Sequence, residues 1–235
     1  MREWFDFWLK DIRSDSLRLN EVSMQIDLEK RREYHGANTI LNQKKLKFYL
    51  HPRSSFSHGK MKYEVYEGDN TDVIFSGRDT RAKSGVPILS AIIDGHFQVP
   101  VYSSMPWIQR ANGVYYRSVK FKSGAKIRGI PKLSLTTNSA GKHYHLMAYL
   151  YDRTPFGLTK LITHGAATSV HHDGELERFE IDLVATAYDL PPGHSLVLAL
   201  DTQDLLYAKP LGVIPYRTTI HFSDKLTNEF LVPIL

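Results

Sequence analysis

The serine at position 195 lies in a context that resembles a catalytic motif. Gly193-His194-Ser195-Leu196-Val197 supplies the first glycine and the serine of a G-x-S-x-G nucleophile elbow, with a histidine beside the serine. The closing glycine is replaced by Val197, and the apolar run 196–200 predicts a strand where an elbow needs a helix. No other serine has glycine two residues before and two after it. The sequence therefore lacks the elbow, and we assign no catalytic residue.

Histidines and aspartates raise the question of a metal site. His143 and His145 would face the same side of a strand, and His171-His172-Asp173 adds nitrogen and oxygen ligands. Zinc needs three or four convergent ligands, so exposed hairpin histidines are the prediction. Calcium would draw on loop carboxylates, but no D-x-D-x-D-G loop is formed by Asp69, Asp72, Asp152, Asp201 and Asp204. We predict that Asp152 caps or turns a strand end, and we assign neither metal nor cofactor.

Basic and aromatic residues suggest two kinds of binding surface. Lysines at 44–47 and the basic residues of 117–128, near aromatic residues, would suit a nucleic acid. Outward lysines on edge strands that oppose aggregation explain them better at this modest charge, so no nucleic-acid partner is predicted. Trp107, Tyr115 and Tyr116 lie in predicted loops and are the candidate ligand or pocket contacts.

Composition excludes several classes of protein. The 235 residues include 42% apolar and 23% charged residues, a net charge of +5 and no cysteine. This composition excludes wholesale disorder, disulfides and thiol chemistry. No apolar run approaches the ~20 residues that a bilayer-spanning helix needs, so no membrane partner is predicted. Acidic residues among the first aromatics rule out the usual signal peptide. They favour the cytoplasm only if the chain is whole, and for a fragment the localisation stays unknown.

The elements that would position these residues fall into two parts. Residues 1–12 predict a helix with an apolar stripe of Trp4, Phe5, Trp8, Leu9 and Ile12. Residues 13–38 are polar, include the run Lys30-Arg31-Arg32-Glu33, and are expected to be a solvated connection.

From about residue 40, short alternating stretches predict strands at 46–50, 62–65, 118–122, 132–136 and 179–183. The runs 145–151 and 196–200, apolar on both faces, predict central strands. With turn signals between them, the predicted fold is mainly β, a β-sandwich. Its predicted core is Leu133, Leu135, Leu146, Leu150, Ile181, Leu183, Leu196, Leu198 and Leu200. Residues 68–116 are expected to be an ordered excursion with short strands.

Several motifs in one order resemble a known family. I-R-G-I-P-K-L-S-L at 127–135 is similar to the "I-x-G-x-P-x-L-x-L" strand of the C-terminal domain of X-Pro dipeptidyl-peptidases. That domain also occurs in the cocaine-esterase-like (CocE/NonD) acyl hydrolases. Further segments resemble its later motifs: L-M-A-Y-L-Y-D at 146–152, L-I-T-H-G at 161–165, A-Y-D-L-P-P-G-H-S-L at 187–196, and Asp201 to Asp204 with Tyr207.

The resemblance extends to the first helix. W-F-D-F-W-L-K at 4–10 is similar to the family's "W-F-D-x-W-L-K-G", although Asp11 stands where glycine is usual. In the family this motif ends the α/β-hydrolase domain, after the catalytic triad, so no triad residue can be carried over. The resemblance implies that residues 1–38 are the end of a hydrolase domain with a linker. Residues 39–235 would then be a jelly-roll sandwich of galactose-binding-domain type.

Three hypotheses of function follow. The first is a non-catalytic C-terminal domain of a serine hydrolase that cleaves Xaa-Pro peptides or esters. It would contribute scaffold, pocket wall or oligomer contacts, with the α/β-hydrolase domain of the same protein as partner. The alternative is a free-standing jelly-roll binding module for carbohydrate or another ligand. The third, catalysis by the histidine-rich loops, has the least support.

Overall fold

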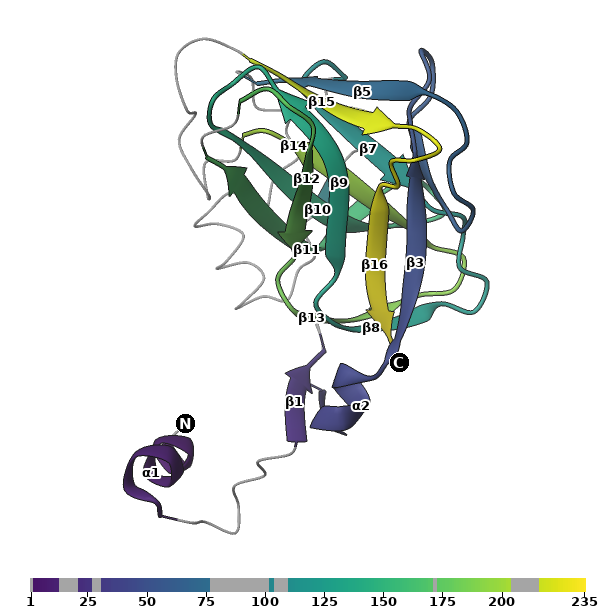
Figure 1. The fold of residues 1–235 in the computed structure, drawn as a ribbon. Coiled ribbons are helices and arrows are strands. Elements are labelled where there is room, and N and C mark those ends of the chain that lie inside the picture. The colour runs from purple at the N-terminus through teal and green to yellow at the C-terminus, as the bar shows by residue number, and fades with distance from the viewer. Residues whose placement is uncertain are drawn as a thin grey trace.

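The chain folds mainly into β-strands, as the sequence predicts. The computed structural model describes residues 2–12, 21–26, 31–76, 102–103, 110–170, 173–203 and 216–235. In Figure 1 a stacked β-sandwich forms the main body, and the N-terminal elements lie at one end of it. These elements are α1 (Arg2–Lys10), the antiparallel hairpin of β1 (Glu21–Gln25) and β2 (Arg32–Gly36), and α2 (Ala37–Leu41).

The first layer of the sandwich is centred on two long strands, β10 and β14, which pair antiparallel. In hydrogen-bonded order it consists of β6 (Tyr102–Ser103), β11 (Thr159–Ser169), β10 (Tyr144–Arg153), β14 (Ser195–Asp201), β7 (Gly113–Arg117) and β4 (Gly59–Lys62). The β4–β7 pair is parallel, whereas the other pairs of this layer are antiparallel.

The second layer is built around β9, which pairs with strands on both sides. Its members are β5 (Asn70–Phe75), β15 (Arg217–Phe222), β9 (Lys132–Ser139), β12 (Glu177–Asp182), β16 (Glu229–Ile234), β3 (Lys44–His51), β8 (Ala125–Gly129) and β13 (Thr186–Leu190). Because β3 also pairs with β4, the two layers stay hydrogen-bonded to each other along one side.

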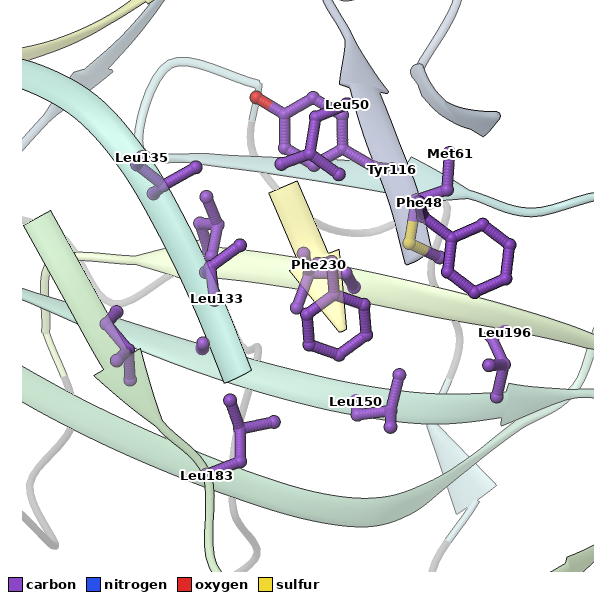
Figure 2. Packing of buried hydrophobic residues seen from close by; sticks show 14 of the residues in the cluster. Phe48, Leu50, Met61, Tyr116, Leu133, Leu135, Leu150, Leu183, Leu196 and Phe230 are labelled. Carbon is purple, nitrogen blue, oxygen red and sulfur yellow. The ribbon is translucent and has the colours of Figure 1, made fainter. Parts of the chain in front are cut away.

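The core lies between the layers, as Figure 2 shows for side chains from both of them. Alternate residues of β10 and β14 point inward, because successive side chains of a strand face opposite sides. They meet Phe48 of β3 and Phe230 of β16, both fully buried. The predicted core is confirmed, since each of its members is buried: Leu133, Leu135, Leu146, Leu150, Ile181, Leu183, Leu196, Leu198 and Leu200.

The outer faces of β10 and β14 are buried as well. Met147, Tyr149 and Tyr151 of β10 pack with Val197 and Ala199 of β14 in a second apolar cluster. The prediction of central strands that are apolar on both faces is therefore confirmed for these two elements.

Two predicted strands are wrong or shifted. At 118–122 the chain bulges: Ser118 and Phe121 still donate backbone hydrogen bonds to Leu196 and His194, but Val119 between them is exposed. The stretch predicted at 62–65 belongs to β4 only up to Lys62, and Tyr63 then turns to stack on Phe48 with ring centroids 5.1 Å apart.

The polar segment 13–38 is more structured than expected. It contains the β1–β2 hairpin and the start of α2, and Ile26 at the end of the hairpin is buried. Of the excursion 68–116, the described parts contain β5, β6 and the first strand-forming residues of β7. Trp107 lies outside the described residues.

Truncating Leu198 tests the core. Its side chain is fully buried in β14, so Leu198→Ala removes packed methyl groups and leaves a cavity. We expect the free energy of unfolding to fall by about 2–5 kcal/mol in chemical denaturation. The exposed Leu176 offers a matched control, and Leu176→Ala should change stability by less than about 0.5 kcal/mol. Equal effects of the two substitutions would show that the Leu198 side chain does not face the core.

Candidate functional site

Three segments singled out by sequence meet at the carboxylate of Asp152. The Tyr188 hydroxyl donates to Oδ2 of Asp152 at 2.7 Å, and Nδ1 of His194 lies 2.7 Å from Oδ1. Asp152 is buried within β10 rather than capping its end, and His194 keeps 18% of its side chain exposed. Lys160 lies over the Tyr188 ring, 4.6 Å from its centroid. The cluster joins β10, β13 and the turn before β14.

This cluster has two members of a hydrolytic triad but no nucleophile. In a triad the histidine accepts a proton from a serine on the side opposite its carboxylate. Ser195 is nearly fully buried at the start of β14, and within the described ranges no serine hydroxyl is hydrogen-bonded to His194. The Asp152–His194 pair connects β10 to the turn before β14.

A second polar cluster surrounds the fully buried guanidinium of Arg128. Its Nε donates to Glu33 at 2.9 Å, and one terminal nitrogen donates to Asp189 at 2.5 Å. The other terminal nitrogen donates to the carbonyls of Ile127 and Tyr188. Buried charge is tolerated only when it is paired and fully hydrogen-bonded, which this arrangement provides.

The Arg128 cluster attaches the N-terminal hairpin to the sandwich. Glu33 lies on β2, whereas Arg128 and Asp189 lie on the paired strands β8 and β13. Arg31 closes the network by donating to both Glu33 and Asp189, at 2.8 and 2.7 Å. The hydrogen bond from Arg128 lowers the pKa of Glu33 to about 2, so its carboxylate is charged at neutral pH. The run 30–33, predicted to be a solvated connection, thus supplies a buried ion pair.

The aromatic residues expected to contact a ligand lie in different environments. Tyr116 points into the core, where it is fully buried and its hydroxyl donates to the buried Asp72 at 2.7 Å. Burial raises the pKa of Tyr116 well above its ordinary value. A ligand contact by Tyr116 is therefore not supported. Tyr115 points to the opposite side of β7 and is half-buried, so its role as a ligand contact stays a prediction.

Tyr115 belongs to a positively charged surface on the outer side of the first layer. We define the basic face as His58, Lys60, Tyr115, Arg117 and Arg153. The rings of His58 and Tyr115 stack with centroids 5.2 Å apart and planes 13° apart. Lys60 pairs in register with Arg117 across β4 and β7. Burial, and then the charges of Arg117 and Arg153, lower the pKa of His58.

Of the histidines considered as metal ligands, the structure describes His143, which is exposed, and His145, which is buried. His145 is buried on the same face of β10 as Met147, and burial lowers its pKa, so the prediction of an exposed histidine is wrong at this position. His171 and His172 lie outside the described residues. Among the residues that the structure describes, no group of three or more histidine, aspartate or glutamate side chains is placed to hold a metal ion.

At the N-terminus, α1 presents large apolar side chains to solvent. In Figure 1 this helix lies apart from the sandwich. Phe5, Trp8 and Leu9 are 47%, 59% and 75% exposed, and Ile12 just beyond the helix is also exposed. This confirms the predicted helix and leaves these large apolar side chains about half or more exposed. No helix in the described ranges is both long enough and apolar enough to cross a bilayer.

Sequence reasoning missed the residues that hold these sites together. In the sequence, Arg128 stands out only within the basic stretch 117–128 and a family-like motif, and Glu33 only within a charged run. Their pairing over 95 positions carries no local signal. His58 had no signal at all, because nothing in its neighbourhood distinguishes it from a surface loop histidine.

Comparison with known proteins identifies the family of this β-sandwich. Residues 24–218 match the model of the family described as X-Pro dipeptidyl-peptidase C-terminal non-catalytic domain. The chain belongs to this family. A comparison with curated proteins finds no match.

Solved structures support the fold. An aminopeptidase from a marine sediment Thaumarchaeota archaeon superposes with a TM-score of 0.68 at 13% identity, covering 100% of this chain and 43% of that one. A CocE/NonD family hydrolase from Staphylococcus aureus gives 0.63 at 12% identity, covering 100% and 45%. An α-amino acid ester hydrolase gives 0.59 at 12% identity, covering 80% and 36%. The chain thus spans less than half the length of these structures.

The Arg128 cluster predicts a specific pH dependence. The pKa of Glu33 falls from an ordinary 4.5 to about 2 in the folded chain, so its carboxylate stabilises the fold above pH 4.5. That contribution is lost as the pH falls towards 2. Glu33→Gln should therefore lower the free energy of unfolding by about 1.5–3 kcal/mol at neutral pH, and by progressively less in acid.

Urea unfolding across this pH range measures the effect. The exposed Glu67 provides a control, since Glu67→Gln should cost little at any pH. A loss of stability in Glu33→Gln that is the same at pH 7 and at pH 2 would contradict the ion pair.

Proposed function

We propose that this chain is the C-terminal part of a serine hydrolase of the X-Pro dipeptidyl-peptidase or CocE-like acyl esterase type. In that protein α1 closes a preceding α/β-hydrolase domain, and the sandwich begins near residue 39. The parent cleaves an Xaa-Pro peptide or an ester through an acyl-enzyme intermediate. The chain supplies scaffold, a wall of the substrate pocket or an oligomer contact, and no nucleophile.

The observation that carries this proposal is the exposed apolar surface of α1. A short helix with Phe5, Trp8 and Leu9 in water gains stability when these side chains are buried, at roughly 1.5–3 kcal/mol for each fully buried group. Such a patch marks an interaction surface. The family match and the superposed hydrolases, which are more than twice as long, support a catalytic domain as the partner.

The Arg128 cluster fits the same proposal. The hairpin that follows α1 is held to β8 and β13 by the pairs of Arg128 with Glu33 and Asp189. A chain segment that leaves a catalytic domain would therefore meet the sandwich at a fixed point. This geometry suits a domain that positions or supports its neighbour.

The second candidate is a free-standing binding module. It is favoured by one feature, the stacked His58 and Tyr115 beside Arg117 on the outer face. A gene in which an open reading frame with G-x-S-x-G precedes residue 1 in frame would support the hydrolase proposal, and a natural start at Met1 would support the module.

The isolated chain should have no serine-hydrolase activity. Ser195 is buried, and in the described part of the chain no serine is hydrogen-bonded to His194. We expect no turnover of p-nitrophenyl acetate or of an Ala-Pro chromogenic substrate, and no labelling by a fluorophosphonate probe. Stoichiometric labelling that Ser195→Ala abolishes would refute the assignment. A parent hydrolase assayed in parallel serves as the positive control.

Without its partner, α1 should drive self-association of the isolated chain. Docking on a second copy would bury the exposed face that the catalytic domain otherwise covers. Sedimentation velocity should show a dimer for residues 1–235 and a monomer once residues 1–12 are removed. The double substitution Phe5→Ser with Trp8→Ser should act like the deletion, whereas Lys10→Ser, on the same helix, should not. A monomer in every case would argue against this role of α1.

A further inference from the structure

The basic face concentrates positive charge, and in the described part of the chain no carboxylate pairs with its lysine and arginines. Within the described residues, Lys60, Arg117 and Arg153 form no ion pair. By contrast, Arg31, Arg53 and Arg128 each pair with an aspartate or glutamate. Half-buried guanidinium groups lose part of their hydration and need a partner to compensate for it.

Strand register places these charges on one side of the sheet. Arg117 lies opposite Val197 on β14, and Val197 lies opposite Tyr151 on β10. Residues directly opposite each other point to the same face, and so do residues two apart on a strand. Arg153 therefore points to the same outer side as Tyr151. It lies two residues further along β10 than Tyr151, which is in register with Val197 and Arg117. Lys60 extends that row on β4.

The surrounding loops hold the charged groups in place. Arg110 donates to the carbonyls of Ser54 and Ser57, which tethers the loop that leads into His58. Gly157, in a tight turn with φ of 95°, lies against Arg153: a Cβ built there would sit 3.1 Å from a guanidinium nitrogen. Glycine at this position leaves room for the guanidinium where a larger residue would crowd it.

Several positive charges act on the imidazole of His58. The pKa of His58 is lowered first by burial and then by the charges of Arg117, Arg153, Lys60 and Arg110. Burial and the neighbouring Arg117 also lower the pKa of Arg153. The strand register and the stacked rings place this positive charge around the His58–Tyr115 pair. The guanidinium fork matches the geometry of carboxylates and phosphates.

We propose that the basic face binds a small ligand through an oxyanion, a phosphate or a carboxylate, held by Arg117 and Arg153 beside the stacked His58 and Tyr115. Lys60, exposed on the neighbouring strand β4, adds a further positive charge to the site. This site does not depend on the hydrolase assignment, because it is built entirely from strands and loops of the sandwich.

The imidazole of His58 provides the readout. Its ring signals would be followed by NMR in the full chain while inorganic phosphate, and separately acetate, is added at constant ionic strength held by sodium chloride. We expect a saturable shift and a rise in the pKa of His58, because a bound anion favours the imidazolium. Saturation with phosphate alone would identify a phosphate ligand, and saturation with acetate alone a carboxylate. No saturable response to either anion would overturn the proposal.

Charge-matched variants test the residues. Arg117→Gln and Arg153→Gln should each weaken binding about tenfold or more, and Arg153→Lys should weaken it less because it keeps the charge without the fork. Lys142→Gln removes the same charge from an exposed turn at the other end of β10 and should leave binding unchanged.

A folding control separates loss of the site from loss of the fold. In the free protein, Arg117→Gln should also raise the pKa of His58, which a general loss of packing at a distant site would not do. Chemical denaturation would confirm that each variant is folded. Equal weakening by Lys142→Gln, or unchanged binding in both arginine variants, would refute the site.

Discussion

Burial of both faces of β10 and β14 is the constraint on which the rest of the structure depends. Their inner residues, such as Leu150 and Leu198, build the core with the second layer. Their outer residues, such as Tyr149 and Val197, form a second dry cluster. Strands with two apolar faces cannot lie at a surface, so other parts of the chain must border them on both sides. The basic face lies at the margin of that outer cluster, where Tyr115 packs against it.

Buried charge fixes how the loops and the N-terminal hairpin attach to this framework. Apolar packing is tolerant of small shifts, whereas a buried carboxylate or guanidinium requires partners at defined positions. Arg128 sets the place of β2, and Asp152 sets the turn before β14. Asp72 is held by Tyr116 and Arg53 inside the core, where burial raises its pKa.

The buried polar residues connect strands and turns of the sandwich. The Asp152–His194 pair has catalytic residue types in a structural arrangement, because the nearby Ser195 is locked into β14. The groups that remain available lie elsewhere: apolar side chains on α1 and cations on the basic face. Both surfaces suit binding, one of a protein neighbour and the other of a small anion.

The sequence by itself determined the β-sandwich, its core and the lack of a nucleophile elbow. Those properties follow from period-two alternation, as at Leu133 and Leu135, and from residues adjacent in the chain, as at Ser195 and Val197. The resemblance to the X-Pro dipeptidyl-peptidase C-terminal domain was likewise evident from local sequence motifs. Only the tertiary structure decided that Tyr115 faces outward while Tyr116 faces inward, that Glu33 pairs with Arg128, and that His58 stacks on Tyr115. These contacts join residues far apart in sequence, and their energies depend on burial and register, which no local pattern records.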